Sequence, residues 1–382
     1  MTSTLMSKLA TWLGGHDEVR DGKQPVGRHR VAWVLLCALV ILAGVELAAQ
    51  VREHLLSGRT ARTTLVADSE YVVDPVTGLR LLRPNATLES ARHVLRTNSL
   101  GLRSDELATV KPQDEFRVIV IGASNVMGVF AASNSQTLPS LLEQELRARW
   151  SPRNVRVVNA GIAGSDLAAQ GRMLKWLAER LTPDLVLFYS GANDISTYCW
   201  QRLPSTPHES RFGLPQLELP LGLQSVDLLL KNTAGLRRVA FAGAAVINAA
   251  ELDTSDYRRR LVGLVQTAAA HRVRIVLATS ARGYRAEQPV ALQQQLATMD
   301  LKNKSCFDLA GLHTIYRRHN AVIHEVGAAL GVPVVPIGEL IPGGPDYFVD
   351  STHFSERGIH QVVKHYAEFL THADLNGPGA RP

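Results

Sequence analysis

Five short apolar segments, each followed by a turn, constrain the fold of this chain more than any other feature. They are rich in β-branched residues and cover residues 117–122, 155–159, 184–190, 273–280 and 332–336. Leucines spaced three or four residues apart predict helices between them, at residues 138–146, 174–181 and 261–265. Continuously apolar strands that alternate with helices are typical of a parallel sheet with helices on both faces. The sequence therefore predicts an α/β domain over residues 116–375.

The longest apolar run precedes this domain. Residues 31–49 contain a single charged residue, Glu46, near the end of the run. Because a helix needs about 20 apolar residues to cross a bilayer, the run predicts a single transmembrane anchor after a polar tail of residues 1–30. A buried helix fits less well because the run is apolar on all sides, and a cleaved signal peptide fits less well because its charged leader would be unusually long. The short tail and the large body that follows favour a main domain outside the cytoplasm, periplasmic or extracellular, and the basic residues flanking the run give only a slight bias in that direction.

Two further segments fall outside the strand–helix pattern. Residues 50–115 predict a stalk that docks on the main domain, with a short hairpin at Tyr71–Leu82 and a compact turn at Thr97–Arg103. Residues 197–250 begin with four prolines and continue as an alanine-rich helical stretch. This segment is too long for a simple connection, so we expect an insertion or lid beside the preceding strand end.

Charge and cysteine usage argue against several function classes. The 382 residues carry a net charge of +6, but the basic residues are scattered rather than interleaved with aromatic ones, so we expect no nucleic-acid partner. The three cysteines lack the spacing of a zinc site, and the glycines miss the dinucleotide fingerprint, so we expect no metal and no cofactor. Cys199 and Cys306 are left either as one disulfide in an oxidising compartment or as two free thiols.

Polar residues gather where the predicted strands end. Ser124 follows the first strand, Gly161 the second and Asn193 the third, and Asp350 and His353 follow a strand-like run near the C-terminus. A serine is a weak nucleophile until an adjacent base accepts its proton, and His353 can do so while Asp350 holds the other ring nitrogen. The backbone N–H groups of Ser124 and Gly161 and the amide of Asn193 are candidate donors to an oxyanion. The constellation predicts acyl transfer.

In these four blocks the chain resembles the SGNH (GDSL-type) hydrolases. The blocks are Gly122–Asn125, Asn159–Gly164, Gly191–Asp194 and Asp350–His353, and the resemblance covers about residues 116–370. It implies a flavodoxin-like three-layer α/β/α sandwich with a mainly parallel five-stranded sheet. It also implies a nucleophilic Ser124, oxyanion donors at Gly161 and Asn193, and an Asp350–His353 pair. The family usually has Gly-Asp-Ser, and Ala123 replaces that Asp here, so we expect altered bonding in the serine loop.

The resemblance also implies a serine ester hydrolase without a cofactor. We expect it to act on an envelope or extracellular ester, such as an O-acetylated glycan. The alternatives are an O-acetyltransferase for an extracellular polysaccharide and a catalytically silent glycan-binding or assembly module. An α/β-hydrolase shares the order Ser, Asp, His, but Val126 stands where that fold expects a glycine. Arg282 and Tyr284 are weaker candidates for the substrate pocket, Asp194 is expected to cap the segment after it, and the oligomeric state is left open.

Overall fold

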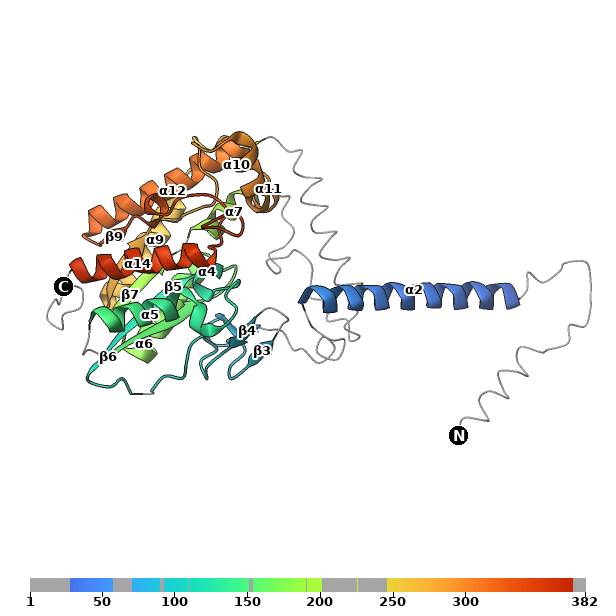
Figure 1. Cartoon of the computed structure of the whole chain (residues 1–382), viewed down its shortest axis with the longest axis horizontal. Helices are drawn as coiled ribbons and strands as arrows, with labels where there is room; N and C mark the ends of the chain where they lie inside the picture. The colour runs from blue at the N-terminus through green and yellow to red at the C-terminus, as the bar shows by residue number, and fades with distance from the viewer. Residues whose placement is uncertain are drawn as a thin grey trace, which may run out of the picture. The chain divides into compact units, whose positions relative to one another are not determined.

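A computed structural model describes residues 28–57, 71–89, 93–108, 110–150, 154–189, 191–200, 225 and 246–373. The chain divides into two compact units (Figure 1). One comprises residues 1–65 and 218–232, and the other comprises residues 66–217 and 233–382. Each is described by itself.

The first unit contains one long helix, α2 (Arg28–Ser57). Its segment Val31–Arg52 has a mean hydropathy of 2.5 and is not buried, so it is long and apolar enough to cross a membrane. The carboxylate of Glu46 accepts hydrogen bonds from Gln50 Nε2 at 2.9 Å and from Ser225 Oγ at 2.6 Å. Length and composition make this N-terminal helix a candidate for a membrane anchor and equally for a signal sequence.

The second unit contains a five-stranded parallel sheet in the order β6-β5-β7-β8-β9, which confirms the predicted fold class. If β5 is counted as the first strand, the order is 2-1-3-4-5, which is the flavodoxin-like order. The last strand is shorter than its predicted segment because prolines stand on both sides of it. The bounds are β5 Glu115–Gly122, β6 Asn154–Gly161, β7 Leu185–Tyr189, β8 Arg274–Ala278 and β9 Val334–Val335.

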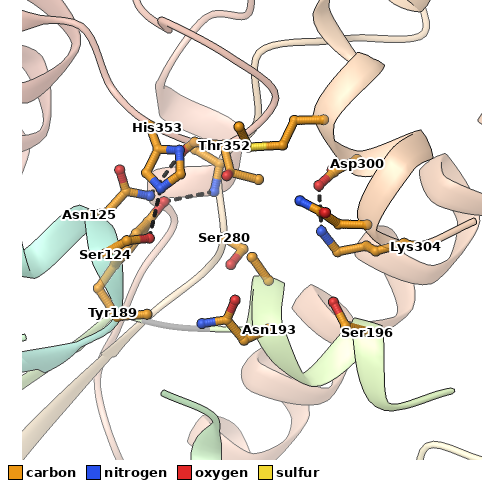
Figure 2. A pocket seen from close by; sticks show the side chains of 16 residues that line it. Ser124, Asn125, Tyr189, Asn193, Ser196, Ser280, Asp300, Lys304, Thr352 and His353 are labelled. Carbon is orange, nitrogen blue, oxygen red and sulfur yellow. Dashed lines mark hydrogen bonds and ion pairs between the residues drawn. The ribbon is translucent and has the colours of Figure 1, made fainter. Parts of the chain in front are cut away.

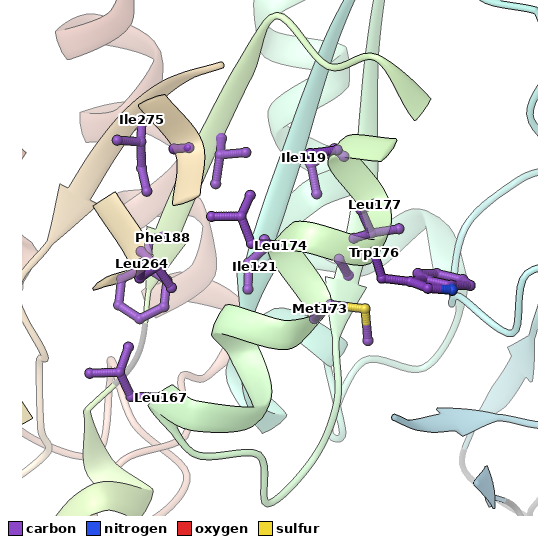
Figure 3. Close-up of a cluster of buried hydrophobic side chains, with 14 of the residues drawn as sticks. Ile119, Ile121, Leu167, Met173, Leu174, Trp176, Leu177, Phe188, Leu264 and Ile275 are labelled. Carbon is purple, nitrogen blue, oxygen red and sulfur yellow. The ribbon is translucent and has the colours of Figure 1, made fainter. Parts of the chain in front are cut away.

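Helices cover both faces of the sheet because its side chains alternate. Val118 and Val120 of β5 pack with α5 (Leu138–Arg149) and α14 (Glu356–His372). Ile119 and Ile121 point to the other face, where Figure 3 shows them beside helix α6. This second layer comprises α6 Leu167–Leu181, α9 Ser255–Ala270 and α12 Leu309–Leu330. Both faces are apolar, as the continuous apolar strands predicted.

The segment before the sheet forms two antiparallel hairpins. The first pairs β1 (Tyr71–Val73) with β2 (Arg80–Leu82), as predicted. The second pairs β3 (Thr87–Glu89) with β4 (Val94–Arg96), and the sequence analysis did not predict it. Leu82 and Leu102 from this segment belong to the same hydrophobic cluster as the α6 side chains.

A third, smaller cluster lies around α7 (Ala192–Trp200), α10 (Val290–Leu296) and α11 (Thr298–Asn303). A Cys199–Cys306 disulfide joins the end of α7 to the segment after α11, which resolves the choice between paired and free thiols. Most of the predicted insertion at 197–250 lies outside the described residues. The remaining short helices are α4 Ser124–Met127, η1 Asn134–Gln136 and α13 Ile337–Leu340.

Candidate active site

The site lies at the carboxyl end of the sheet, where the strand order reverses on the two sides of β5. Open α/β sheets bind ligands at such switch points. Ser124 begins the short helix α4 directly after β5, and the turn between them needs a glycine. A Cβ on Gly122 would meet the carbonyl oxygen of Tyr189 at 2.4 Å and the Cγ2 of Val126 at 2.4 Å. The close approach of β5, β7 and α4 therefore forces the chain to turn sharply and expose the serine.

Ser124, His353 and Asp350 form one continuous hydrogen-bonded chain. The Ser124 Oγ lies 2.7 Å from His353 Nε2, and His353 Nδ1 lies 2.7 Å from Asp350 Oδ2. The second carboxylate oxygen of Asp350 accepts the backbone N–H groups of Thr352 at 2.9 Å and His353 at 2.8 Å. Figure 2 shows the serine and the imidazole facing one side of the pocket. The structure therefore brings together residues that are 229 positions apart in sequence.

The carboxylate of Asp350 is suited to hold the imidazole in one tautomer. Burial would raise its pKa, but the hydrogen bond and charge of His353 outweigh burial and hold the pKa below the usual 3.8. The carboxylate is therefore ionised at neutral pH and accepts a hydrogen bond from a protonated Nδ1 of His353. With the proton on Nδ1, the Nε2 atom has a lone pair for the hydroxyl of Ser124.

Asn125 links the serine turn to the histidine loop, and the sequence analysis missed it. Its Nδ2 donates to the Thr352 carbonyl at 2.8 Å, and its Oδ1 accepts the Phe354 N–H at 3.2 Å. The two bonds hold the residue before His353 and the residue after it. The ring of Phe130 packs edge-on against the imidazole with centroids 5.1 Å apart, although the Phe130 side chain is 57% exposed.

Asn193 lies in the pocket wall, but the structure gives Gly161 a different role from the predicted one. The Asn193 Nδ2 donates one hydrogen bond to the Ser165 carbonyl at 2.8 Å, which leaves its second N–H free for another acceptor.

The Gly161 N–H instead donates to Asn159 Oδ1 at 3.0 Å, and Gly161 does not line the pocket. A Cβ at Gly161 would meet the Met127 backbone nitrogen at 2.1 Å. This glycine therefore lets α4 pack on β6, and its predicted role as an oxyanion donor lacks structural support.

Gly164, in the same loop, has an available N–H group. It is exposed, has a φ of 75°, and its N–H has no acceptor within the described residues. The loop is held to the sheet end by Ser165, whose Oγ donates to the Gly122 carbonyl at 3.2 Å. The backbone N–H of Ser124, at the start of α4, also has no acceptor in this part of the structure.

A buried arginine, Arg103, supports the loop after Ser124. Arg103 is 1% exposed, and its guanidinium donates to backbone carbonyls of the α4 end and the following loop. Burial lowers its pKa to about 10, so it remains charged at neutral pH. Its acceptors are the carbonyls of Val94, Met127, Gly128 and Ala131 and the side chain of Asn134.

Arg282 and Tyr284 do not line the pocket, contrary to prediction. Tyr284 is fully buried and donates to Asp300 Oδ2 at 2.8 Å. Arg282 donates to the Leu312 carbonyl at 3.3 Å, and its guanidinium lies 5.3 Å from the centre of the Tyr284 ring. Both side chains turn into the third cluster rather than toward the sheet edge.

Asp194 caps a helix, but not the one that follows it. Both of its carboxylate oxygens accept the N–H of Leu167, the first residue of α6, at 3.1 and 3.2 Å. Burial raises the pKa of Asp194 to about 7. The side chain therefore ties the start of α6 to α7, the helix that carries both Asn193 and Asp194.

The pocket encloses about 100 Å³. Ser124, Asn125, Asn193 and His353 lie on its lining, together with residues of α7 and α11. Its lining side chains are predominantly polar (Figure 2). Among the described residues, no group of three or more His, Cys, Asp or Glu side chains is arranged to hold a metal ion.

Comparison with known proteins identifies the fold family. The model of the GDSL-like Lipase/Acylhydrolase family matches residues 120–360. A lipase/acylhydrolase from Enterococcus faecalis is 17% identical, with 67% of this chain and 96% of that chain covered and a TM-score of 0.40. A GDSL-like lipase from Bacteroides thetaiotaomicron is 13% identical, with 70% and 93% covered and a TM-score of 0.41. A comparison with curated protein sequences finds no match.

The family match begins inside β5, just before Ser124, and ends inside α14, just after His353. It covers more than half of the chain and includes the end of β5 and the whole of the other four strands of the parallel sheet. The chain therefore belongs to the GDSL-like lipase/acylhydrolase family and is a hydrolase of ester bonds.

Proposed function

We propose that this protein cleaves an acyl ester with Ser124 as nucleophile. The observation that carries the proposal is the hydrogen-bonded chain from Ser124 through His353 to Asp350. The Ser124 oxygen attacks the ester carbonyl while its proton passes to His353 Nε2. The tetrahedral intermediate then expels the alcohol, which takes that proton from His353, and an acyl-serine remains. Water then attacks the acyl-serine while His353 Nε2 takes a proton from it. His353 returns this proton to the Ser124 oxygen as the acid leaves, which restores Ser124.

The oxyanion that forms during each attack needs donors aimed at it. Our candidates are the Ser124 N–H and the free amide proton of Asn193, which line the pocket, and the Gly164 N–H. Gly164 does not line the pocket, but its neighbour Ser165 bonds to Gly122 and Asn193. Removing one such donor costs about 3–4 kcal/mol of transition-state stabilisation in comparable sites. In this proposal Gly161 acts only through the packing of α4.

The pocket favours a short acyl group. Its volume is about 100 Å³, and most of the residues that line it carry polar side chains. Such a lining disfavours the burial of a long apolar acyl chain, so a short acyl group fits it better. We therefore propose an acetyl ester as the substrate, and expect p-nitrophenyl acetate to be cleaved faster than the octanoate.

Two features of the chain support action outside the cytoplasm. Disulfides persist in oxidising compartments, and the structure contains the Cys199–Cys306 disulfide. The apolar helix α2 is suited to hold the enzyme at a membrane. An O-acetylated glycan of the cell envelope is the substrate class that fits this location.

The decisive experiment compares wild-type protein with Ser124→Ala, using Ser135→Ala as the control. Ser135 is exposed and lies outside the pocket. We expect turnover of p-nitrophenyl acetate and fluorophosphonate labelling in the wild type and the control, and neither in Ser124→Ala. Turnover that persists in Ser124→Ala would refute the nucleophile, and an inactive wild type would favour the silent binding module. Transfer of acetyl to an added sugar, in place of acetate release, would show the acetyltransferase.

A further inference from the structure

Opposite Ser124, the pocket has a polar wall that the proposed chemistry does not use. Met299, Asp300, Asn303 and Lys304, on and just after α11, line this wall. Ser196, one helical turn after Asn193 on α7, lines the same region. Figure 2 shows Asp300, Lys304 and Ser196 across the pocket from Ser124 and His353.

Asp300 has no oxygen left for a substrate. It is 1% exposed, and one carboxylate oxygen pairs with the ammonium of Lys304. The other oxygen accepts the hydroxyls of Tyr284 at 2.8 Å and Tyr316 at 3.0 Å. Burial raises the pKa of both tyrosines, so both hydroxyls keep their protons and donate. The role of Asp300 is therefore to hold Lys304 in place.

Lys304 has hydrogen bonds still to make. Its side chain is 6% exposed, and its ammonium carries three protons, of which Asp300 accepts one. The other protons have no acceptor in the part of the chain that the structure describes. Leaving the protons of a buried ammonium without acceptors is costly. The pair with Asp300 therefore accounts for only one of the three protons of Lys304.

Two neighbours also have unused hydrogen-bonding capacity. The hydroxyl of Ser196, a residue that is 7% exposed, and the side-chain amide of Asn303 have no partner among the described residues. The Cys199–Cys306 disulfide ties α7, which carries Ser196, to the segment that carries Lys304. The three groups are thus held on linked elements around one pocket.

We propose that Ser196, Asn303 and Lys304 form a subsite for oxygen atoms in the alcohol part of the ester, which identifies that alcohol as a sugar. This inference rests on the proposed acetyl ester chemistry. An acetyl group brings one carbonyl oxygen, which is used at the oxyanion donors, so further acceptor oxygens must come from the alcohol. Sugar hydroxyls both donate and accept, which matches a hydroxyl, an amide and an ammonium. An alkyl alcohol would leave these groups unpaired, and such sites discriminate strongly against analogues that lack the polar group.

The test compares two acetate esters, p-nitrophenyl acetate and a mono-O-acetylated methyl glucoside, in full-length protein. For Lys304→Met we expect KM for the sugar ester to rise roughly 10- to 100-fold, while kcat/KM for p-nitrophenyl acetate stays within about threefold. Lys302→Met is the matched control, because Lys302 is exposed on the same helix and does not line the pocket. It should leave both substrates unchanged.

Because Lys304→Met strands the charge of Asp300 and can destabilise the fold, Asn303→Ala serves as a second variant. Asn303 is exposed, so its loss should raise KM for the sugar ester several-fold at an unchanged melting temperature. Equal losses on both substrates, or no loss in either variant, would overturn the subsite. A loss confined to a polar acyl ester, such as p-nitrophenyl hemisuccinate, would overturn its assignment to the alcohol. Activity that survives Ser124→Ala would instead refute the proposed function, so the two failures are distinguishable.

Discussion

Asn125 connects the two loops that meet at the pocket, and its removal should separate catalysis from binding. Asn125→Leu loses the bonds to the Thr352 carbonyl and the Phe354 N–H, which hold His353 from both sides. A small displacement of a catalytic group costs about 100-fold in rate. We expect kcat for p-nitrophenyl acetate to fall about 10- to 100-fold with little change in KM. Labelling by a fluorophosphonate should slow in parallel, and a kcat within twofold of wild type would contradict the role of Asn125.

Asp194 should make the stability of the fold depend on pH. Its pKa is 3.8 in the unfolded chain and about 7 in the folded one, because burial disfavours the charge. Between these pH values the folded state holds a proton that the unfolded state has lost, so the free energy of unfolding falls as pH rises from about 4 to about 7. The full difference corresponds to about 4 kcal/mol. Asp194→Asn keeps an acceptor for Leu167 and should remove this fall.

Urea denaturation between pH 4 and pH 8 measures the effect of Asp194. The variant and the wild type should be equally stable near pH 4, and the variant should be more stable at pH 8. Asp105→Asn is the control, because the Asp105 side chain is 82% exposed and makes only a 3.5 Å ion pair with Arg156. Parallel curves for wild type and Asp194→Asn would show that the folded carboxyl titrates normally.

The residues that sequence reasoning placed well are those that occur in short motifs. Asp350 and His353 are three positions apart, and a short turn suffices to bring them together. The bond from the Gly161 N–H to Asn159 could not be foreseen, because a glycine needed for packing and a glycine that offers its N–H look the same in sequence. Lys304 was missed because it stands out only as a charged residue that is buried, and burial is visible only in the folded chain.

Arg103 joins the segment before the sheet to the catalytic loop, which makes this segment part of the site. Among the described residues, Arg103→Met should leave the Ala131 carbonyl without a donor and weaken the bonding of the Met127 and Gly128 carbonyls. These two keep only Asn159 Nδ2 at 3.5 Å and the Ala131 N–H at 2.9 Å, so the chain directly after Ser124 should loosen. Each buried group left unpaired costs about 1–3 kcal/mol. We expect lower stability and a kcat that falls about 10-fold or more with KM nearly unchanged. Arg103→Lys keeps the charge and part of the bonding and should recover some of the loss.

The control for Arg103 is Arg96→Met, because the Arg96 side chain is exposed on the neighbouring strand β4. It should leave kinetics and stability unchanged. The informative measurement is fluorophosphonate labelling per folded molecule, since a merely structural arginine would reduce the folded fraction alone. Wild-type labelling rates in folded Arg103→Met would therefore contradict a positioning role.

The elements of the sheet could be predicted because apolar strands and amphipathic helices have distinct periods. The parallel direction of the strands also follows from the alternation of strands and helices, which allows few topologies. The second hairpin was missed because strands of three residues carry too little pattern, and the sequence between them contains no Gly, Pro, Asn or Asp to signal a turn. The contribution of Arg103 was hidden because the acceptors of its guanidinium lie 9 to 31 positions away in sequence, at Val94 and within residues 127–134.

One unit of the chain contains the candidate membrane helix α2, and the other contains the enzyme with its disulfide. In the chain-entropy model, a cross-link that closes a loop of about 100 residues stabilises a fold by about 4.7 kcal/mol, and Cys199 and Cys306 are 107 positions apart. Disulfides persist in oxidising compartments and are rare in the cytoplasm. We therefore propose a transmembrane α2 with the enzyme on the outer side, where the disulfide is retained.

The anchor can be tested on the full-length protein expressed in membranes. If α2 is an uncleaved span, alkaline carbonate should leave the protein in the membrane pellet at its full mass, because a helix of this hydropathy is held by its apolar surface. A cleaved signal sequence would instead give a shorter, carbonate-soluble protein. Thiol labelling of the denatured, unreduced protein should modify Cys37 alone, because Cys199 and Cys306 are paired. Labelling of all three cysteines would place the enzyme in a reducing compartment and refute the outward orientation, even if the anchor holds.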